Sequence, residues 1–286
     1  MPAFLQIDGT VTVLQPLTHV ADSPDEGLIA QGNQLFHRKM KVYTAEGPVL
    51  VPVISGNSIR GIMRRLGAAA FLEMLGLDGD GIPPKLKHLL FAGGALEESR
   101  KGKRQPADPE ASSTGPAIAP AELRRRIPLL SLLGCSYRQH MLQSKLIADF
   151  LVPCVDEIAE LRRQPKPGIQ SYEITGWLFY TRTNERGNEA PSKSNQMIYQ
   201  MEYVIPGTVF LHGFTLIGTD DIETALFHHL LELLTAHGRL GGRIRQGHGA
   251  VRFDYNAQSR DAAPYTAYVK ENKPAIVDFL QRTWNF

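Results

Sequence analysis

The sequence predicts an α+β sandwich of the ferredoxin-like type, formed by a single domain over residues 1–286. Patterns typical of strands and helices follow one another in the order strand, helix, strands, helix, strand, with insertions between them. Hydrophobic residues make up 43% and charged residues 21% of the chain, as in ordinary globular proteins, so a sizeable core can form. Neither an internal repeat nor a second autonomous core is visible in the sequence.

The first strand and the first helix have clear periodicities. Apolar and polar residues alternate over 5–13, which predicts a half-buried strand, and the polar stretch 19–32 predicts a loop. Apolar residues then recur at helical spacing over 59–70, and Asn57 or Ser58 is expected to cap this helix.

Small and charged residues dominate the middle of the chain. Residues 96–122 contain almost no large apolar side chain, which predicts a mobile surface loop. Helical segments are expected near Glu122 and around Tyr137, and a strand over 145–155.

A long hairpin is predicted in the second half of the chain. Its strands cover 172–181 and 197–205, and the polar segment between them forms a soluble tip. After a tight turn, a further strand is expected over 208–217.

The last elements have strong boundary signals. A helix with apolar residues at helical spacing begins after Asp220, its predicted cap, and ends at Gly238. We expect a strand over 250–255 and a last helix that starts at Pro274.

Composition excludes several classes of protein. No stretch approaches the roughly 18 uninterrupted apolar residues of a membrane span, and the N-terminus lacks the features of a secretion signal. Cys135 and Cys154 are too few for a disulfide framework or a zinc site, so we expect reduced thiols in a cytoplasmic protein. We expect neither a metal site nor a cofactor.

The formal net charge is only +2, but clustered arginines create local anion sites. The strongest cluster follows the glycine-containing turn 55–58, where a helix start offers free N–H groups and its dipole to an anion. Arg60 and Arg64 lie one helical turn apart and could hold consecutive phosphates, with Arg65 beside them. The alternative is an ordinary capped helix with a solvated basic face.

A second cluster interleaves glycine and arginine over residues 238–249. It follows a helix and precedes a strand, which is the reverse of a dinucleotide-binding fingerprint, and no Gly-Lys-Ser/Thr closes it as in a Walker A loop. A backbone cradle for a phosphodiester fits better, because glycine lets the main chain approach a ligand closely. A flexible connection between helix and strand is the alternative.

The long hairpin over 177–203 is the third feature. Tyr180, Met197 and Tyr199 lie on strands that extend beyond their neighbours, and such side chains can wedge between nucleotide bases. The alternative is an edge hairpin packed on its own core.

Catalytic candidates are weaker. His19, Asp22, Asp25, Glu26 and His37 lie near one loop region, and a nuclease would need such groups to converge. Their spacing matches no known ligand pattern, so a solvated loop explains them as well. A general-base role is conceivable for His248, between two glycines, but we assign no catalytic residue.

Four segments, taken in order, resemble the RAMP superfamily of CRISPR–Cas proteins, above all its Cas-seven-type backbone subunits. They are the loop Pro16–Asp22, the helix start Val53–Gly61, the corner Glu202–Phe210 and the glycine-rich loop 238–249. Each motif is moderately specific, and the resemblance covers about residues 4–255.

The resemblance implies a modified RNA-recognition-motif palm, a helical fingers insertion over 58–145 with the mobile loop 96–122, and a thumb hairpin over 177–203. It also implies that the chain binds guide RNA along the sugar-phosphate backbone while guide pairing reads the target. The residues predicted to bind RNA are Ser55, Gly56, Asn57, Ser58, Arg60, Arg64, Arg65, His19, Gly241, Gly242, Arg243, Arg245, Gln246 and His248. Those predicted for the thumb are Tyr180, Arg182, Met197 and Tyr199.

One departure from the family bears on activity. Type III backbone subunits cut target RNA with an aspartate in the loop that corresponds to 31–36, and no aspartate stands there. The resemblance therefore implies a non-cleaving subunit, with type IV favoured, that oligomerises along guide RNA with other CRISPR effector subunits and presents it to a DNA or RNA target. The alternative is a RAMP ribonuclease that cuts target RNA or processes guide RNA.

Overall fold

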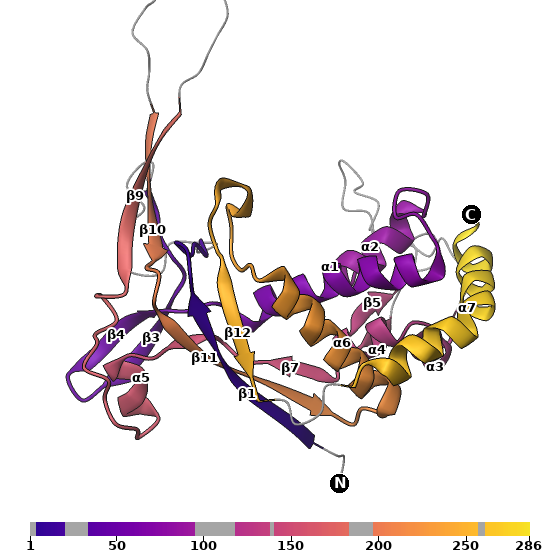
Figure 1. The fold of residues 1–286 in the computed structure, drawn as a ribbon, viewed down its shortest axis with the longest axis horizontal. Coiled ribbons are helices and arrows are strands. Elements are labelled where there is room, and N and C mark those ends of the chain that lie inside the picture. The colour runs from indigo at the N-terminus through magenta and orange to yellow at the C-terminus, as the bar shows by residue number, and fades with distance from the viewer. Residues whose placement is uncertain (1–3, 21–33, 95–117, 138–139, 183–196, 257–260) are drawn as a thin grey trace, which may run out of the picture.

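An antiparallel sheet forms the centre of the computed structural model, which describes residues 4–20, 34–94, 118–137, 140–182, 197–256 and 261–286 (Figure 1). The strand order is β12-β1-β11-β7, and the short strand β8 also pairs with β11. These strands are β1 (Phe4–Val13), β7 (Leu146–Ala148), β8 (Val152–Pro153), β11 (Val209–Ile217) and β12 (Val251–Tyr255).

Two helices complete the ferredoxin-like repeat. With α1 (Gly56–Leu75) and α6 (Asp221–His237), the chain order becomes β1-α1-β7-β11-α6-β12. In the sheet, the fourth, first, third and second strands of this βαββαβ unit lie side by side, and all neighbours are antiparallel. The predicted α+β, ferredoxin-like fold is therefore confirmed.

Three insertions and a C-terminal helix surround this unit. The first insertion lies between β1 and α1, the second between α1 and β7, and the third between β7 and β11. Because α1 is the first helix of the repeat, we place the start of the helical insertion after α1 rather than at residue 58. The added elements are β2 (Gln34–Leu35), β3 (Lys39–Thr44), β4 (Gly47–Pro52), α2 (Pro84–Ala92), α3 (Pro120–Arg126), α4 (Pro128–Leu133), β5 (Cys135–Tyr137), β6 (His140–Leu142), α5 (Asp156–Leu161), β9 (Thr175–Arg182), β10 (Met197–Val204) and α7 (Ala263–Trp284).

The hairpin of β9 and β10 projects away from the rest of the molecule (Figure 1). Its two strands pair in antiparallel register from Thr175 opposite Val204 to Arg182 opposite Met197, and β2 joins β10 in parallel. The predicted tip, residues 183–196, lies outside the described residues.

One face of the central sheet forms the core with the helices. Ile7 and Val11 of β1, together with Phe210 and Phe214 of β11, are almost completely buried. This follows from the strand periodicity, since alternate residues point to the same face. Each such side chain stabilises the fold by roughly 1.5–3 kcal/mol.

Helix α6 has the boundaries that the sequence predicts. The Asp220 side chain accepts a hydrogen bond from the Glu223 N–H, and the Glu223 carboxylate accepts one from the Asp220 N–H. Gly238 ends the helix in the left-handed conformation. Glu223 also receives hydrogen bonds from Lys145 and Ser131, which ties α6 to α4 and to the start of β7.

Helix α1 begins earlier than predicted. Its N-cap is Ser55 rather than Asn57 or Ser58, and no side chain caps the helix. Gly56 is the first helical residue, and a side chain is excluded at this position because a methyl group would overlap the carbonyl oxygen of Ala148 in β7. This close approach sets the helix start directly against the edge strand of the sheet.

Four other boundary predictions are wrong. Tyr137 lies in a strand, because β5 pairs with β6. The predicted strand over 145–155 is broken, because Leu151 pairs with Ile54. Residues 120–122 are helical rather than part of a loop, and the last helix begins at Ala263, with Pro274 in its interior. Of the two predicted loops, 19–32 and 96–122, residues 21–32 and 96–117 lie outside the described ranges.

We expect Gly56→Ala to lower the free energy of unfolding by about 1–3 kcal/mol, because the new methyl group meets main chain that cannot move aside. Gly61→Ala is the matched control in the same helix, since its methyl group would meet only the flexible end of Arg65 at 3.3 Å. That change should stabilise the helix by about 0.5–1 kcal/mol. Urea unfolding of both variants measures the difference, and equal stabilities would contradict the packing of α1 on β7.

Candidate nucleic-acid interface

Main-chain hydrogen bonds connect the two glycine-containing basic motifs. The N–H of Gly242 donates to the carbonyl of Thr18 at 2.8 Å, and the N–H of Arg38 donates to that of His19 at 2.7 Å. The N–H of Val53 in turn donates to the carbonyl of Arg38 at 3.0 Å. Two short segments therefore bridge the glycine-rich loop and the start of α1, so motifs far apart in sequence lie on one contiguous part of the molecule.

The start of α1 has the properties of an anion site. Ser55 is the N-cap residue by position, but its side chain accepts no hydrogen bond from a main-chain N–H of the helix. Its hydroxyl instead hydrogen-bonds to the hydroxyl of Ser58 at 3.0 Å. Asn57 is exposed, and no acidic residue lies in the first turn. The positive end of the helix dipole is thus not neutralised by a local carboxylate.

Arg60 and Arg64 converge on the end of α4. Arg60 donates from Nη2 to the carbonyl of Leu133 at 2.9 Å, and Arg64 donates from Nη2 to Leu133 and Gly134 at 2.8 and 2.7 Å. Burial, and secondarily the charge of Arg60, lowers the pKa of Arg64 to about 10. Burial also lowers the pKa of Arg60. Neither arginine forms a salt bridge within the described ranges, so two positive charges share this corner of the molecule without a compensating carboxylate.

Arg64 is far less accessible than Arg60 and Arg65, and the cause lies in its tertiary contacts. Only 9% of Arg64 is exposed, and its guanidinium group packs against Gly93. Its Nη1 is buried and has no hydrogen-bond partner among the described residues. Arg64 therefore supports the fold at this corner, whereas Arg60 is only half-buried and Arg65 is exposed.

The glycines of the loop 238–249 serve mainly the backbone. Gly241 and Gly249 have φ angles of 77° and 73°, and methyl groups there would overlap the carbonyls of Thr18 and Leu240. At Gly247, by contrast, φ is 86° and the space around the α-carbon is open. Most of these glycines are thus explained by turns and close packing rather than by access to a ligand.

The tip of this loop carries the exposed groups. Arg245, Gln246 and Gly242 are exposed, and residues 244–246 form a single 3₁₀ turn. His248, which the sequence analysis placed among the RNA contacts, is instead buried, and its Nε2 hydrogen-bonds to the hydroxyl of Tyr180. Burial, and secondarily Arg243, lowers the pKa of His248.

Two further residues at the end of α6, His237 and Arg239, are not among those predicted to bind RNA. The pKa of His237 is lowered by burial and then by the charges of Arg65 and Arg239. Three basic residues thus influence one another electrostatically at the C-terminus of α6. Arg239 donates to the side chain of Gln15 at 2.8 Å and to the carbonyl of His248 at 3.2 Å. No local pattern could have identified this group, since it depends on α1 and α6 packing together.

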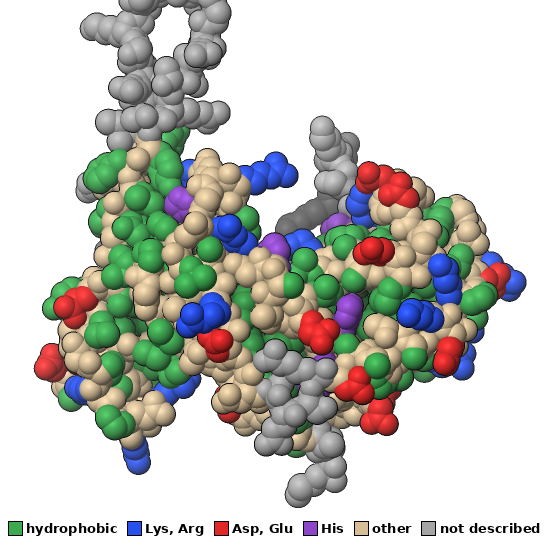
Figure 2. All heavy atoms as spheres, in the orientation of Figure 1, with side chains coloured by type: hydrophobic (Ala, Val, Ile, Leu, Met, Phe, Trp, Pro, Cys, Tyr) green, Lys and Arg blue, Asp and Glu red, His purple; other side chains and the backbone are tan. Residues whose placement is uncertain are grey.

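Figure 2 shows a saddle between the hairpin side and the helical side of the molecule. Lys or Arg and His side chains lie at its floor. Positive groups in a concave surface raise the local concentration of an anionic ligand.

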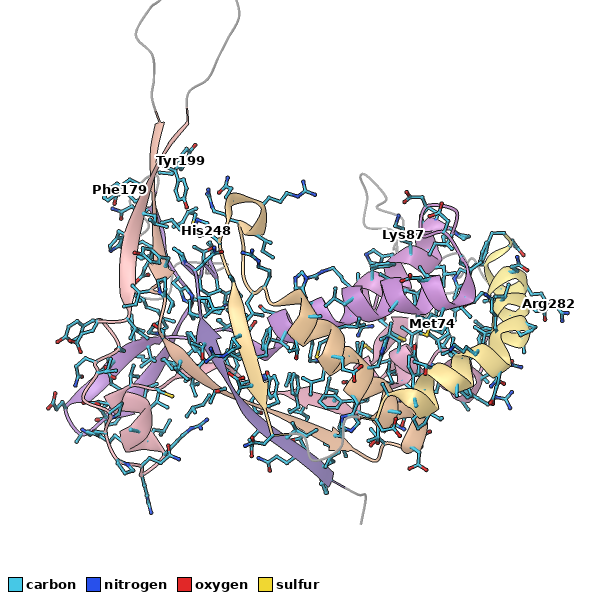
Figure 3. The ribbon with its side chains drawn as sticks, in the orientation of Figure 1. Met74, Lys87, Phe179, Tyr199, His248 and Arg282 are labelled. Carbon is cyan, nitrogen blue, oxygen red and sulfur yellow. The ribbon has the colours of Figure 1, made fainter. Side chains whose placement is uncertain are left out.

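The hairpin has two different faces. Tyr180 and Tyr199 lie directly opposite each other in the strand register. In Figure 3, Tyr199 lies on the side of the glycine-rich loop, whereas Phe179 lies on the outer side. Arg182 and Met197 end the described ladder, and their side chains lie outside the described part.

The candidate catalytic residues are only partly described. The rings of His19 and His37 lie 6.1 Å apart, and burial lowers the pKa of His37 to about 4. Asp22, Asp25 and Glu26 fall outside the described ranges. Within those ranges, no group of three or more His, Cys, Asp or Glu side chains could hold a metal ion.

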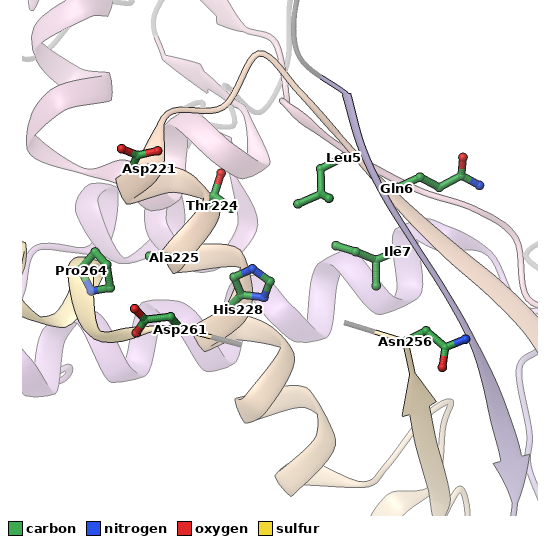
Figure 4. Close-up of a pocket in the computed structure, with 10 residues that line it drawn as sticks. All are labelled: Leu5, Gln6, Ile7, Asp221, Thr224, Ala225, His228, Asn256, Asp261 and Pro264. Carbon is green, nitrogen blue, oxygen red and sulfur yellow. The ribbon is translucent and has the colours of Figure 1, made fainter. Parts of the chain in front are cut away.

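A cavity of about 610 Å³ lies at the other end of β1, against α6 and the residues before α7 (Figure 4). Its described lining includes Asp221 and Asp261 but neither lysine nor arginine. Such a lining does not suit a phosphate group, so we do not include this cavity in the candidate interface.

Two further expectations concern membranes and thiols. Within the described ranges, none of the helices combines the length and the apolar character that a bilayer crossing requires. Cys135 and Cys154 are both free thiols, and burial raises the pKa of Cys135 to about 11.

Comparisons with known proteins agree with this architecture. The family model described as the RAMP superfamily matches residues 10–252. A solved chain described as "Type IV-B CRISPR Complex" is similar in fold, with a TM-score of 0.58 and 21% sequence identity over 89% of this chain and 92% of that chain. No curated protein matches the sequence.

We expect Arg64→Leu to lower the free energy of unfolding by about 2–3 kcal/mol, because it leaves the carbonyls of buried Leu133 and Gly134 with fewer donors. Arg60→Ala should cost less than about 1 kcal/mol, since Leu133 keeps its bond from Arg64 and Arg60 is partly exposed. Thermal or urea unfolding compares the two variants. Equal losses would contradict the structural role assigned to Arg64.

Proposed function

Because the chain belongs to the RAMP superfamily, we propose that it is a CRISPR effector subunit that binds guide RNA. The solved chain of similar fold comes from a type IV-B CRISPR complex, which favours a Cas-seven-type backbone subunit of a type IV effector. The proposed partners are guide RNA, copies of the same chain, other effector subunits and, through the guide, a nucleic-acid target.

The contiguity of the two basic motifs is the observation that carries this proposal. Thr18, His19 and Arg38 join the loop of Gly242 to the start of α1 through main-chain hydrogen bonds. In the part of the chain that the structure describes, Arg60, Arg239 and Arg243 bind carbonyl or amide oxygens, so their positive charge remains available. A chain of phosphates is the ligand that such a row of cations and helix-start N–H groups fits.

The mode of binding follows from the same chemistry. Phosphate contacts fix the position of a strand but carry no sequence information, so any guide sequence would be accepted. The projecting hairpin supports the further proposal that neighbouring copies contact one another along the RNA.

Expression of the chain together with its CRISPR array tests the proposal directly. The purified protein should carry RNA, and the mass of the particle should rise in steps with the length of the guide. A strictly monomeric protein that is free of nucleic acid would overturn the proposed function.

We expect Arg60→Ala and Arg245→Ala each to weaken binding of single-stranded RNA uniformly across sequences. Each change should reduce the slope of log affinity against log salt by about 0.7, the contribution of one phosphate contact to a single strand. Arg252→Ala is the control, because Arg252 is exposed on β12 and pairs with Asp254 at 2.9 Å. Fluorescence anisotropy over a salt series gives the slopes, and an unchanged slope in Arg60→Ala would remove that residue from the interface.

We propose that the subunit positions RNA without cutting it. Target RNA paired to the guide should therefore remain intact after incubation of the assembled complex with magnesium. A gel of labelled target RNA is the measurement. Products that disappear in a His19→Ala complex would instead identify the chain as a ribonuclease.

A further inference from the structure

Tyr180 has a different set of contacts from that expected of a side chain that wedges between bases. Its hydroxyl hydrogen-bonds to Nε2 of His248, and the two rings lie 6.0 Å apart. The guanidinium carbon of Arg243 lies 4.8 Å from the centre of the same ring. One residue of β9 thus contacts two residues of the glycine-rich loop. In Figure 3, His248 lies on the side of this loop that faces the hairpin.

The backbone of the loop is strained at Arg243, the residue that contacts the Tyr180 ring. Arg243 has a φ angle of 54°, in the left-handed region that side chains other than glycine rarely adopt. The neighbouring Gly241 and Gly247 are left-handed as well. The carbonyl of Arg243 accepts hydrogen bonds from the N–H groups of Gln246 and His248, so the strained residue also anchors the turn at the tip of the loop. Among the described residues, the Arg243 guanidinium contacts the ring of Tyr180 and donates a hydrogen bond to Oε1 of Gln246 at 3.0 Å.

The orientation of Arg243 leaves it able to bind a further group. A guanidinium that stacks on an aromatic ring uses its flat face, and its N–H donors point outward in the plane. Its hydrogen-bond partner among the residues that the structure describes is the neutral amide of Gln246, which does not cancel its charge. An in-plane edge of this kind matches two oxygens of a phosphate.

We propose that Tyr180 is a positioning residue, which holds the Arg243 guanidinium in place for a phosphate of the bound RNA and joins the hairpin to the glycine-rich loop as one unit. This inference rests on the proposed function and deepens it. The face of the Tyr180 ring toward the loop is occupied by Arg243, so the residue acts through that arginine rather than by stacking on a base.

A double-mutant cycle on RNA binding shows whether Tyr180 acts by positioning Arg243 or by stacking on a base. Tyr180→Leu should weaken binding of single-stranded RNA nearly as much as Arg243→Ala does, roughly tenfold, as for the loss of one charge-assisted contact. The double variant should bind no more weakly than Arg243→Ala alone, because both changes remove the same contact. Tyr180→Phe, which keeps the ring under Arg243, should retain most of the affinity.

Phe179→Leu is the matched control. Phe179 is the neighbouring aromatic residue of β9, is 66% exposed, and lies on the outer side of the hairpin (Figure 3). Its replacement should leave both the affinity and the salt slope unchanged. Additive losses in the Tyr180 and Arg243 double variant would overturn the inference and show that Tyr180 contacts RNA itself.

A second measurement does not depend on RNA. In the free protein, Tyr180→Leu should accelerate amide hydrogen exchange in the loop 241–248, whereas Phe179→Leu should not. Unchanged exchange in Tyr180→Leu would overturn the inference even if RNA binding is confirmed. If Tyr180→Leu accelerates exchange but the protein binds no RNA, the contact between hairpin and loop is confirmed. The proposed function, rather than this contact, would then be wrong.

Discussion

The main-chain hydrogen bonds of residues 16–19 are the constraint on which the rest of the interface depends. On one side, the N–H groups of Gly249 and Gly242 donate to the carbonyls of Pro16 and Thr18. On another side, Leu17 exchanges two hydrogen bonds with Val204, at the base of the hairpin. Since buried main-chain groups are costly to leave unpaired, these three elements cannot separate without losing several bonds together. The loop, the hairpin and the path to α1 are therefore fixed relative to one another.

The electrostatic character of the surface follows from how its arginines are anchored. Arg60 binds the carbonyl of Leu133, Arg239 binds the carbonyl of His248, and Arg243 binds the side-chain amide of Gln246. A neutral oxygen orients a guanidinium group and leaves its positive charge in place. A carboxylate would orient the group and also neutralise its charge. A formal net charge of only +2 for the whole chain is consequently compatible with a positive local surface around these arginines.

Local signals in the sequence predict the elements that local interactions determine. Asp220 and Gly238 bound α6 because a capping box and a left-handed glycine act within one turn of the helix. The burial of Arg64 could not be predicted in this way, since its partners Leu133 and Gly134 come from a distant insertion. The burial of His248 could not be predicted from local sequence either. Its partner Tyr180 lies 68 residues earlier in the chain, on a strand of the hairpin.

The topology explains why inserted segments provide most of this surface. In the sheet, Thr12 at the end of β1 pairs with Val209 at the start of β11, and Val13 pairs with Val251 at the start of β12. The connection that leaves β1 and the connections that enter β11 and β12 therefore meet at the same end of these three strands. These connections contain the bridging segments, the hairpin and the glycine-rich loop, respectively. The ferredoxin-like repeat thus determines where the surface lies, and the chemistry of the connecting segments determines what it can bind.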